Sequence, residues 1–150
     1  MMKKNVLILI VIFLSLLTLQ AKPKKKNAEN LPLLDTKWTL EEIFELPVSH
    51  IPDTAFIIFH NDYKLSGNFG CNNFFGTYSF GKKRIRLDYF GSTKKMCFNM
   101  DLENQFFKAL KSDITHYYIE KDNLYLLEKL KVVCKFKGIP TQTPPNISPE

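Results

Sequence analysis

The chain has 150 residues, of which 45% are hydrophobic and 13% aromatic, which is enough for one buried core and too apolar for a chain disordered throughout. The formal net charge is +6, but six of the 21 basic residues precede position 31, which leaves 15 against 13 acidic residues over residues 31–138. This nearly neutral body argues against nucleic-acid binding, which needs several clustered phosphate contacts.

The N-terminus has the order of a secretory signal peptide. Two lysines precede a mostly apolar run over residues 6–19, and Gln20 and Ala21 follow it. As a helix, this run reaches about 21 Å, short of the roughly 30 Å hydrocarbon core of a bilayer. We therefore predict a signal peptide over residues 1–21, cleaved after Ala21, with an uncleaved anchor as the alternative. Export predicts a periplasmic or otherwise envelope-associated protein.

Two polar segments flank the predicted domain, which covers residues 35–138. Residues 22–34 contain a lysine run and are predicted to form a solvated basic linker, with weak contact to an anionic membrane surface as the alternative. Residues 139–150 hold four prolines and almost no apolar side chains, so we predict a disordered proline-rich tail.

Between these ends the sequence predicts about eight short strands joined by tight turns. In the segment 84–90, for example, Ile85 and Leu87 fall on one face and Arg84 and Arg86 on the other. Apolar alternation, or enrichment in aromatic and β-branched residues, marks the segments 36–43, 54–60, 63–69, 76–80, 84–90, 116–120, 124–127 and 131–136.

One helix is predicted, over residues 101–112, with Asn99 as its N-cap. Leu102, Phe106 and Leu110 lie on a single apolar stripe of that helix. The fold class expected is mainly β: an antiparallel sheet of about eight strands with one packed helix, which covers an open face or plugs the mouth of a barrel.

A glycine-rich segment over residues 65–78, LSGNFGCNNFFGTY, stands out. A tryptophan precedes it, and residues 92–97, STKKMC, and a glutamate on the predicted helix follow it. This ordered set, from Trp38 to about Phe136, resembles the META domain of HslJ-like bacterial envelope proteins. The motif residues are Trp38, Gly67, Gly70, Cys71, Asn72, Phe74, Gly76, Tyr78, Thr93, Met96, Cys97 and Glu103.

The resemblance implies a small cracked antiparallel β-barrel with a helix, similar in shape to lipid-binding and pilotin-like envelope proteins. It also implies an association with stress and antibiotic tolerance rather than a known reaction. Two residues depart from the family pattern. Met96 stands where the family usually has a small residue before the second motif cysteine, and Cys134 is a cysteine in addition to the two of the motif. On physical grounds the motif is mainly architectural, with glycines at sharp bends and the amide of Asn72 capping backbone groups.

The two motif cysteines, Cys71 and Cys97, are a candidate disulfide, because export places them where disulfides persist. The alternative is that each is a small buried apolar residue. Cys134 is then unpaired and buried, or pairs in place of one of the others. A redox pair is disfavoured because no Cys-x-x-Cys spacing occurs.

Catalytic and metal chemistry find little support in the sequence. The three histidines lack metal-ligand spacing, so neither a metal nor another cofactor is predicted. His60, Asp62 and Ser66 fall close together along one predicted hairpin, without a nucleophile-elbow motif to mark a catalytic triad. We therefore predict that the protein is not an enzyme.

The aromatic residues admit two interpretations. They fill the barrel interior, which is the simpler one, or they line a slot held open by the helix, with Phe56, Phe74 and Phe107 as candidate ligand-lining residues. The leading hypothesis is an exported, non-enzymatic binding module for an apolar, lipid-like ligand or a hydrophobic segment of another envelope protein. The alternative is a purely structural, stress-protective accessory protein without a ligand cavity.

Overall fold

The computed structural model describes residues 29–48, 55–97 and 100–140. The predicted signal peptide, most of the basic linker and all but two residues of the predicted tail lie outside these ranges. Within them, no helix combines the length and the apolar character needed to span a bilayer.

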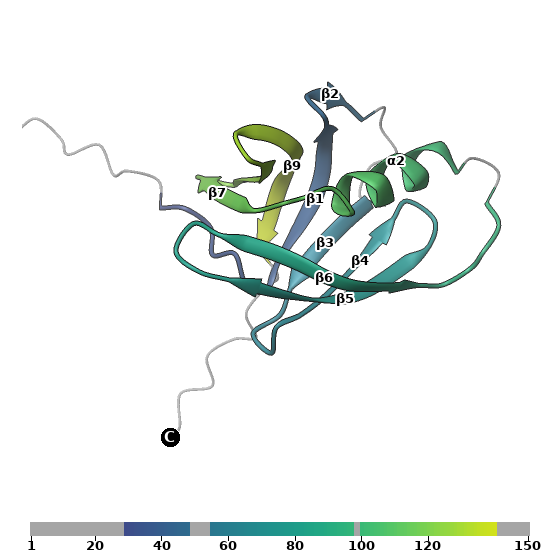
Figure 1. The fold of residues 1–150 in the computed structure, drawn as a ribbon, viewed down its shortest axis with the longest axis horizontal. Helices are drawn as coiled ribbons and strands as arrows, with labels where there is room; N and C mark the ends of the chain where they lie inside the picture. The colour runs from purple at the N-terminus through teal and green to yellow at the C-terminus, as the bar shows by residue number, and fades with distance from the viewer. Residues whose placement is uncertain (1–28, 49–54, 98–99, 141–150) are drawn as a thin grey trace, which may run out of the picture.

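The described chain forms one antiparallel sheet and one helix (Figure 1). Along the sheet the strands follow the order β6-β5-β4-β3-β1-β9-β8-β7, and the short β2 pairs with β1. The elements are β1 (Thr36–Ile43), β2 (Leu46–Pro47), β3 (Ala55–Phe59), β4 (Lys64–Phe69), β5 (Asn73–Phe80), β6 (Ile85–Ser92), α2 (Asp101–Leu110), β7 (His116–Glu120), β8 (Asn123–Glu128) and β9 (Lys131–Pro140).

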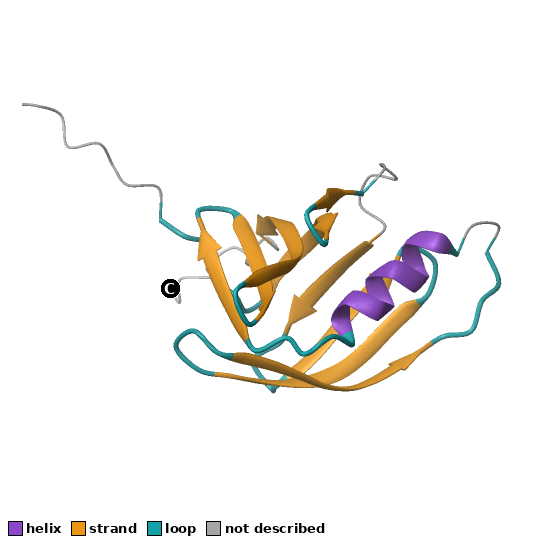
Figure 2. Cartoon of the chain, turned by 45° about the horizontal axis from the view of Figure 1, so that its top comes forward, coloured by secondary structure: helices purple, strands orange, loops and turns teal. Residues whose placement is uncertain are grey.

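The sheet curls until its two edge strands meet at a single bridge between Arg84 and His116. Two backbone hydrogen bonds flank this bridge, from the Ile85 N–H to the Thr115 oxygen and from the Tyr117 N–H to the Lys83 oxygen, each 3.1 Å long. Beyond it the edges diverge, and α2 lies over the opening (Figure 2). The predicted fold class is confirmed: a nearly closed eight-stranded antiparallel barrel with one helix.

The barrel interior is filled largely by aromatic rings. Phe69 stacks on Phe74 with ring centroids 4.1 Å apart, and Phe106 of α2 meets Phe69 edge-on at 5.5 Å. All three are almost completely buried, as are Trp38 and Phe136. Because Phe106 of α2 packs against Phe69 and Phe74 as well as Phe136, the helix is part of the core rather than a removable cover.

Aromatic rings pack directly against the backbone at Gly67 and at Gly138. A Cβ at Gly67 would overlap both the Phe56 carbonyl oxygen and the Phe74 ring, and a Cβ at Gly138 would overlap the Trp38 ring. At a third glycine, Gly70, the backbone has a φ of +117°, which suits glycine and follows the end of β4. Of the motif glycines, Gly67 is thus explained by packing and Gly70 by a turn.

The element boundaries differ from the prediction in a few places. The two-residue β2 was not predicted, β5 begins at Asn73 instead of residue 76, and β9 continues to Pro140, into the predicted tail. The end of the predicted linker packs on the barrel, because Leu33 is buried and the Leu31 N–H donates to the Lys121 oxygen at 2.7 Å. The expected N-cap, Asn99, lies outside the described residues.

Candidate functional site

Three separate parts of the motif meet at the side chain of Asn72, which is 1% exposed. Its amide nitrogen donates to Glu103 Oε1 at 2.9 Å and to the Lys95 oxygen at 3.0 Å. Its amide oxygen accepts from Thr93 Oγ1 and from the Lys95 N–H, both at 2.7 Å. The Asn72 N–H donates to Glu103 Oε2 at 2.9 Å. This Asn72 joint ties the β4–β5 turn to the connection before α2 and to α2 itself.

A disulfide between Cys71 and Cys97 reinforces the same joint, with the two Cα atoms 6.3 Å apart. The candidate pairing made from the motif is therefore present in the structure. Cys134 is free and buried, and burial raises the pKa of its thiol far above the usual range. A thiol held in its protonated form does not act as a nucleophile, so Cys134 has the role of a small core residue.

The remaining motif residues are spread over the barrel. Trp38 is fully buried and its Nε1 donates to the Leu33 oxygen at 3.0 Å. Gly76 and Tyr78 are buried in β5, whereas Met96 is 97% exposed beside the disulfide. The motif therefore holds the fold together at several places instead of converging on one reactive centre.

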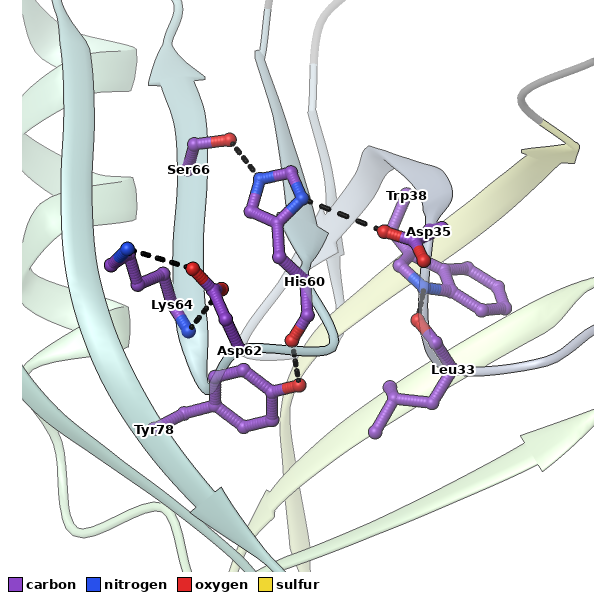
Figure 3. A network of polar contacts seen from close by, with 8 residues as sticks. All are labelled: Leu33, Asp35, Trp38, His60, Asp62, Lys64, Ser66 and Tyr78. Atoms are coloured by element: carbon purple, nitrogen blue, oxygen red, sulfur yellow. Dashed lines mark hydrogen bonds and ion pairs between the residues drawn. The ribbon is translucent and has the colours of Figure 1, made fainter.

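A second polar cluster lies at the other end of β4 (Figure 3). His60 Nε2 lies 2.8 Å from Ser66 Oγ, and His60 Nδ1 lies 3.5 Å from Asp35 Oδ1. Asp62 does not join this row, because it pairs with Lys64 Nζ at 2.7 Å. The carboxylate next to His60 is thus that of Asp35, from the segment before β1, and not that of Asp62, which is nearer in the sequence.

This row has the order of a nucleophile, a base and an orienting carboxylate, but its setting is that of a sheet surface. Ser66 lies inside β4, which pairs with β3 on one side and β5 on the other, so the sheet uses the backbone N–H groups around it. Acyl transfer needs free donors aimed at a developing oxyanion. The cluster therefore connects the chain entry at Asp35 to the β3–β4 hairpin, and the Tyr78 hydroxyl donates to the His60 oxygen at 2.6 Å beside it.

Metal binding has no assembled ligand set in the described part of the chain. No three His, Cys, Asp or Glu side chains there lie close enough to share an ion. His60 and His116 each contact a hydroxyl, of Ser66 and Thr115 respectively, and His50 lies outside the described residues.

The three candidate ligand-lining rings do not surround one slot. Phe56 lies beneath Lys37, whose Nζ is 4.8 Å from the ring centroid, and Phe74 is 2% exposed in the core. Phe107 is 41% exposed on α2, with its ring 5.6 Å from that of Phe69. Alternation along the strands explains the separation, because Phe56 and Phe74 face opposite sides of the sheet.

A groove of about 700 Å³ instead lies where the two edges of the sheet meet. The β5–β6 hairpin forms one wall, and the connection from α2 to β7 and the β8–β9 turn form the other. Its apolar lining includes Phe80, Ile85, Ile114 and Leu130. We call this the seam groove. Sequence patterns did not predict this groove, although Leu130, an apolar residue between two predicted strands, was a signal.

The fold is similar to that of two solved structures. No curated protein matches the chain. One NMR structure is 21% identical in sequence to this chain and superposes with a TM-score of 0.55. The match covers 71% of this chain and 94% of the other. An NMR structure of a protein from Burkholderia xenovorans shares 19% identity at the same TM-score, covering 79% of this chain and 99% of its own. At these identities the likeness shows the fold.

The family assignment comes from the sequence match, which spans most of the described chain. Residues 31–138 match the META domain, and this range contains α2, the Asn72 joint, the seam groove and all of the barrel except the last two residues of β9. It also includes Leu33, whose burial extends the domain into the predicted linker. The chain therefore belongs to the META domain family.

Proposed function

We propose that this META-domain protein is a non-enzymatic binding module of the bacterial envelope, and that the seam groove takes an apolar ligand or a hydrophobic partner segment. The observation that carries the proposal is the groove itself. Its volume of about 700 Å³ falls within the roughly 300–1,000 Å³ of small-molecule sites.

Exposed apolar side chains at the groove support this reading. Leu130 is 93% exposed and Phe80 is 40% exposed, and both belong to the lining. An apolar patch in a concave site loses its contact with water when a ligand covers it. The same surface would be covered by an acyl chain or by an apolar segment of a partner.

The envelope location and the role in stress and antibiotic tolerance are further parts of the proposal. The first rests on the predicted signal peptide over residues 1–21, and the second on the family resemblance. Fractionation of cells that produce the full chain should place the protein in the periplasm or with the envelope. Recovery from the cytoplasm alone would contradict that location.

A purely structural accessory is the alternative, and one observation favours it. The barrel interior is filled, since Phe74, Phe106 and Phe136 are each 2% exposed or less. A protein of this kind would use its surface only as a rigid part of a larger assembly. The two functions differ in whether a free ligand stabilises the isolated domain.

Thermal unfolding with dodecyl maltoside below its critical micelle concentration distinguishes the two. This uncharged amphiphile should stabilise a binding module by mass action, by about 1.4 kcal/mol at ten times its Kd. Leu130→Ser should weaken that stabilisation, whereas Leu46→Ser, which changes a leucine 70% exposed outside the groove, should leave it unchanged. An unchanged melting temperature in the unsubstituted protein would favour the structural accessory.

A further inference from the structure

The charges around the seam groove indicate which kind of apolar ligand it accepts. We propose that it binds a single-chain amphiphile with an anionic oxyacid head, such as a fatty-acid carboxylate. This inference rests on the proposed function, because it takes the groove as the place of the apolar chain and adds a place for the head.

The cationic side of the groove follows from alternation along β6. Ile85 is 2% exposed and faces the core, so Arg84 and Arg86 on either side of it both face outward. Both arginines line the groove. Lys129 lines it as well, next to Leu130 in the β8–β9 turn. Two arginines from one wall and a lysine from the other therefore flank the same space.

These three cationic side chains have donor nitrogens that are not used in ion pairs. Among the residues that the structure describes, Arg84 and Lys129 form no ion pair. Arg86 uses Nε, which lies 2.7 Å from Asp88 Oδ1, and this pairing leaves its terminal nitrogens available. A guanidinium presents paired donors that match the two oxygens of a carboxylate. Arg84 is thus suited to hold an oxyacid head.

The balance of charge in the lining selects the sign of the head. The lining contains three cationic side chains, those of Arg84, Arg86 and Lys129, and one carboxylate, that of Asp113. A cationic head would meet a net repulsion there, whereas an anionic head is attracted. The apolar surfaces of Phe80 and Leu130 lie in the same groove, so the chain and the head of one molecule have adjacent places. The size of the groove fits a single chain rather than a bilayer surface.

Calorimetry or intrinsic fluorescence with three twelve-carbon probes, each at a concentration at which it is monomeric, tests the inference. Dodecanoate should bind at least tenfold more tightly than dodecanol, and dodecyltrimethylammonium should bind more weakly than dodecanol. Added salt should reduce the advantage of dodecanoate, because the arginines are exposed. Equal affinity for dodecanoate and dodecanol would overturn the anionic head and leave the apolar groove standing. Failure of all three probes to bind would overturn both the anionic head and the groove as a site for a free apolar ligand.

Paired charge variants locate the head. Arg84→Gln combined with Lys129→Gln should lower the affinity for dodecanoate to that for dodecanol, with the affinity for dodecanol unchanged. Lys94→Gln combined with Lys108→Gln removes the same charge from exposed positions outside the groove and should change neither affinity. Equal loss of dodecanoate binding in both double variants would show general attraction to a basic surface, which contradicts the inference.

Discussion

At the scale of single residues, the Asn72 amide works as donor and acceptor at once, which an aspartate of the same shape does not do. Asn72→Asp would place a carboxylate against Glu103 and leave the Lys95 oxygen without its donor. We expect a loss of about 3 kcal/mol in the free energy of unfolding, the sum of a buried unpaired group and a like-charge contact. Urea unfolding followed by circular dichroism measures it.

The neighbouring asparagine is a matched control for this substitution. Asn73 is exposed, and its Oδ1 accepts from Asn68 Nδ2 at 2.8 Å, a role that an aspartate retains. Asn73→Asp should therefore change stability by less than about 0.5 kcal/mol. Adding Glu103→Gln to Asn72→Asp should restore part of the loss. Equal unfolding midpoints for the two single variants would show that the joint carries little of the stability.

The phenol of Tyr78 makes the stability of the fold depend on pH in the alkaline range. Burial, the largest cause, raises its pKa to about 12, from about 10 in an unfolded chain. The folded state therefore keeps the proton more tightly, and this stabilisation is complete below pH of about 10 and lost as the pH rises through about 12. A difference of about two pKa units corresponds to roughly 3 kcal/mol. Urea unfolding from pH 8 to about 12 should show the loss.

Tyr78→Phe isolates that contribution. The variant should lose about 1 kcal/mol at pH 8, because the His60 oxygen loses its donor, and should then decline less steeply with pH. The hydrogen bonds from Lys135 to Glu42 and Glu41 raise the lysine pKa. The stabilisation that comes with this shift is also lost at alkaline pH, and it is lost equally in both proteins. Parallel pH profiles for the two proteins would assign the decline to groups other than Tyr78.

At the scale of elements, close strand packing depends on Gly67. Gly67→Ala would drive its Cβ into the Phe56 carbonyl oxygen and the Phe74 ring, so β3 or β5 must shift. We expect a loss of about 3 kcal/mol. In Gly81→Ala the added Cβ meets nothing within 4 Å, and the change should stay within about 0.5 kcal/mol. Chemical unfolding of both variants tests the contrast, which equal stabilities would refute.

The disulfide joins the β4–β5 turn to the connection before α2. Its two cysteines are 26 residues apart, and closing a loop of that length stabilises a fold by about 3.5 kcal/mol in the chain-entropy model. Unfolding of the Cys71→Ser, Cys97→Ser double variant should show most of that loss. Cys134→Ser offers a comparison in which a buried thiol is replaced without breaking a link. A double variant as stable as the parent protein would mean that the Asn72 joint alone fixes the connection.

Most elements were predictable because their side chains alternate between a buried and an exposed face. The bounds of β1 and β7 match the predicted segments, and β8 differs by one residue at each end. β2, with two residues, is too short for any period to show. The start of β5 was not predicted, because Asn73 and the residues before it have the composition of a turn. Leu33 was assigned to the linker because its neighbours are polar, although its side chain is buried.

At the scale of the whole molecule, some candidate sites could be predicted from the sequence and others could not. The residues of the Asn72 joint were identified from the motif, since the family pattern marks them by type and order. The row from Asp35 to Ser66 and the seam groove both depend on contacts between distant segments. No local pattern specifies how far a sheet curls before its edges meet, so Leu130 and Arg84 could not be brought together from sequence alone.

The seam where the two sheet edges meet should open more readily than the rest of the barrel. Only two described backbone bonds flank the bridge between Arg84 and His116, whereas β1 pairs with β3 on one side and β9 on the other. The Ile85 and Tyr117 amides should therefore exchange hydrogen at least about 100-fold faster than the amides of β1, a difference of about 3 kcal/mol in opening free energy. Exchange followed by nuclear magnetic resonance measures each amide separately. Dodecanoate should slow the exchange of the seam amides if the groove needs both walls in place. Seam amides as protected as those of β1 would mean that the barrel opens only by global unfolding, and the groove would then be a fixed surface that a ligand fills without moving either wall.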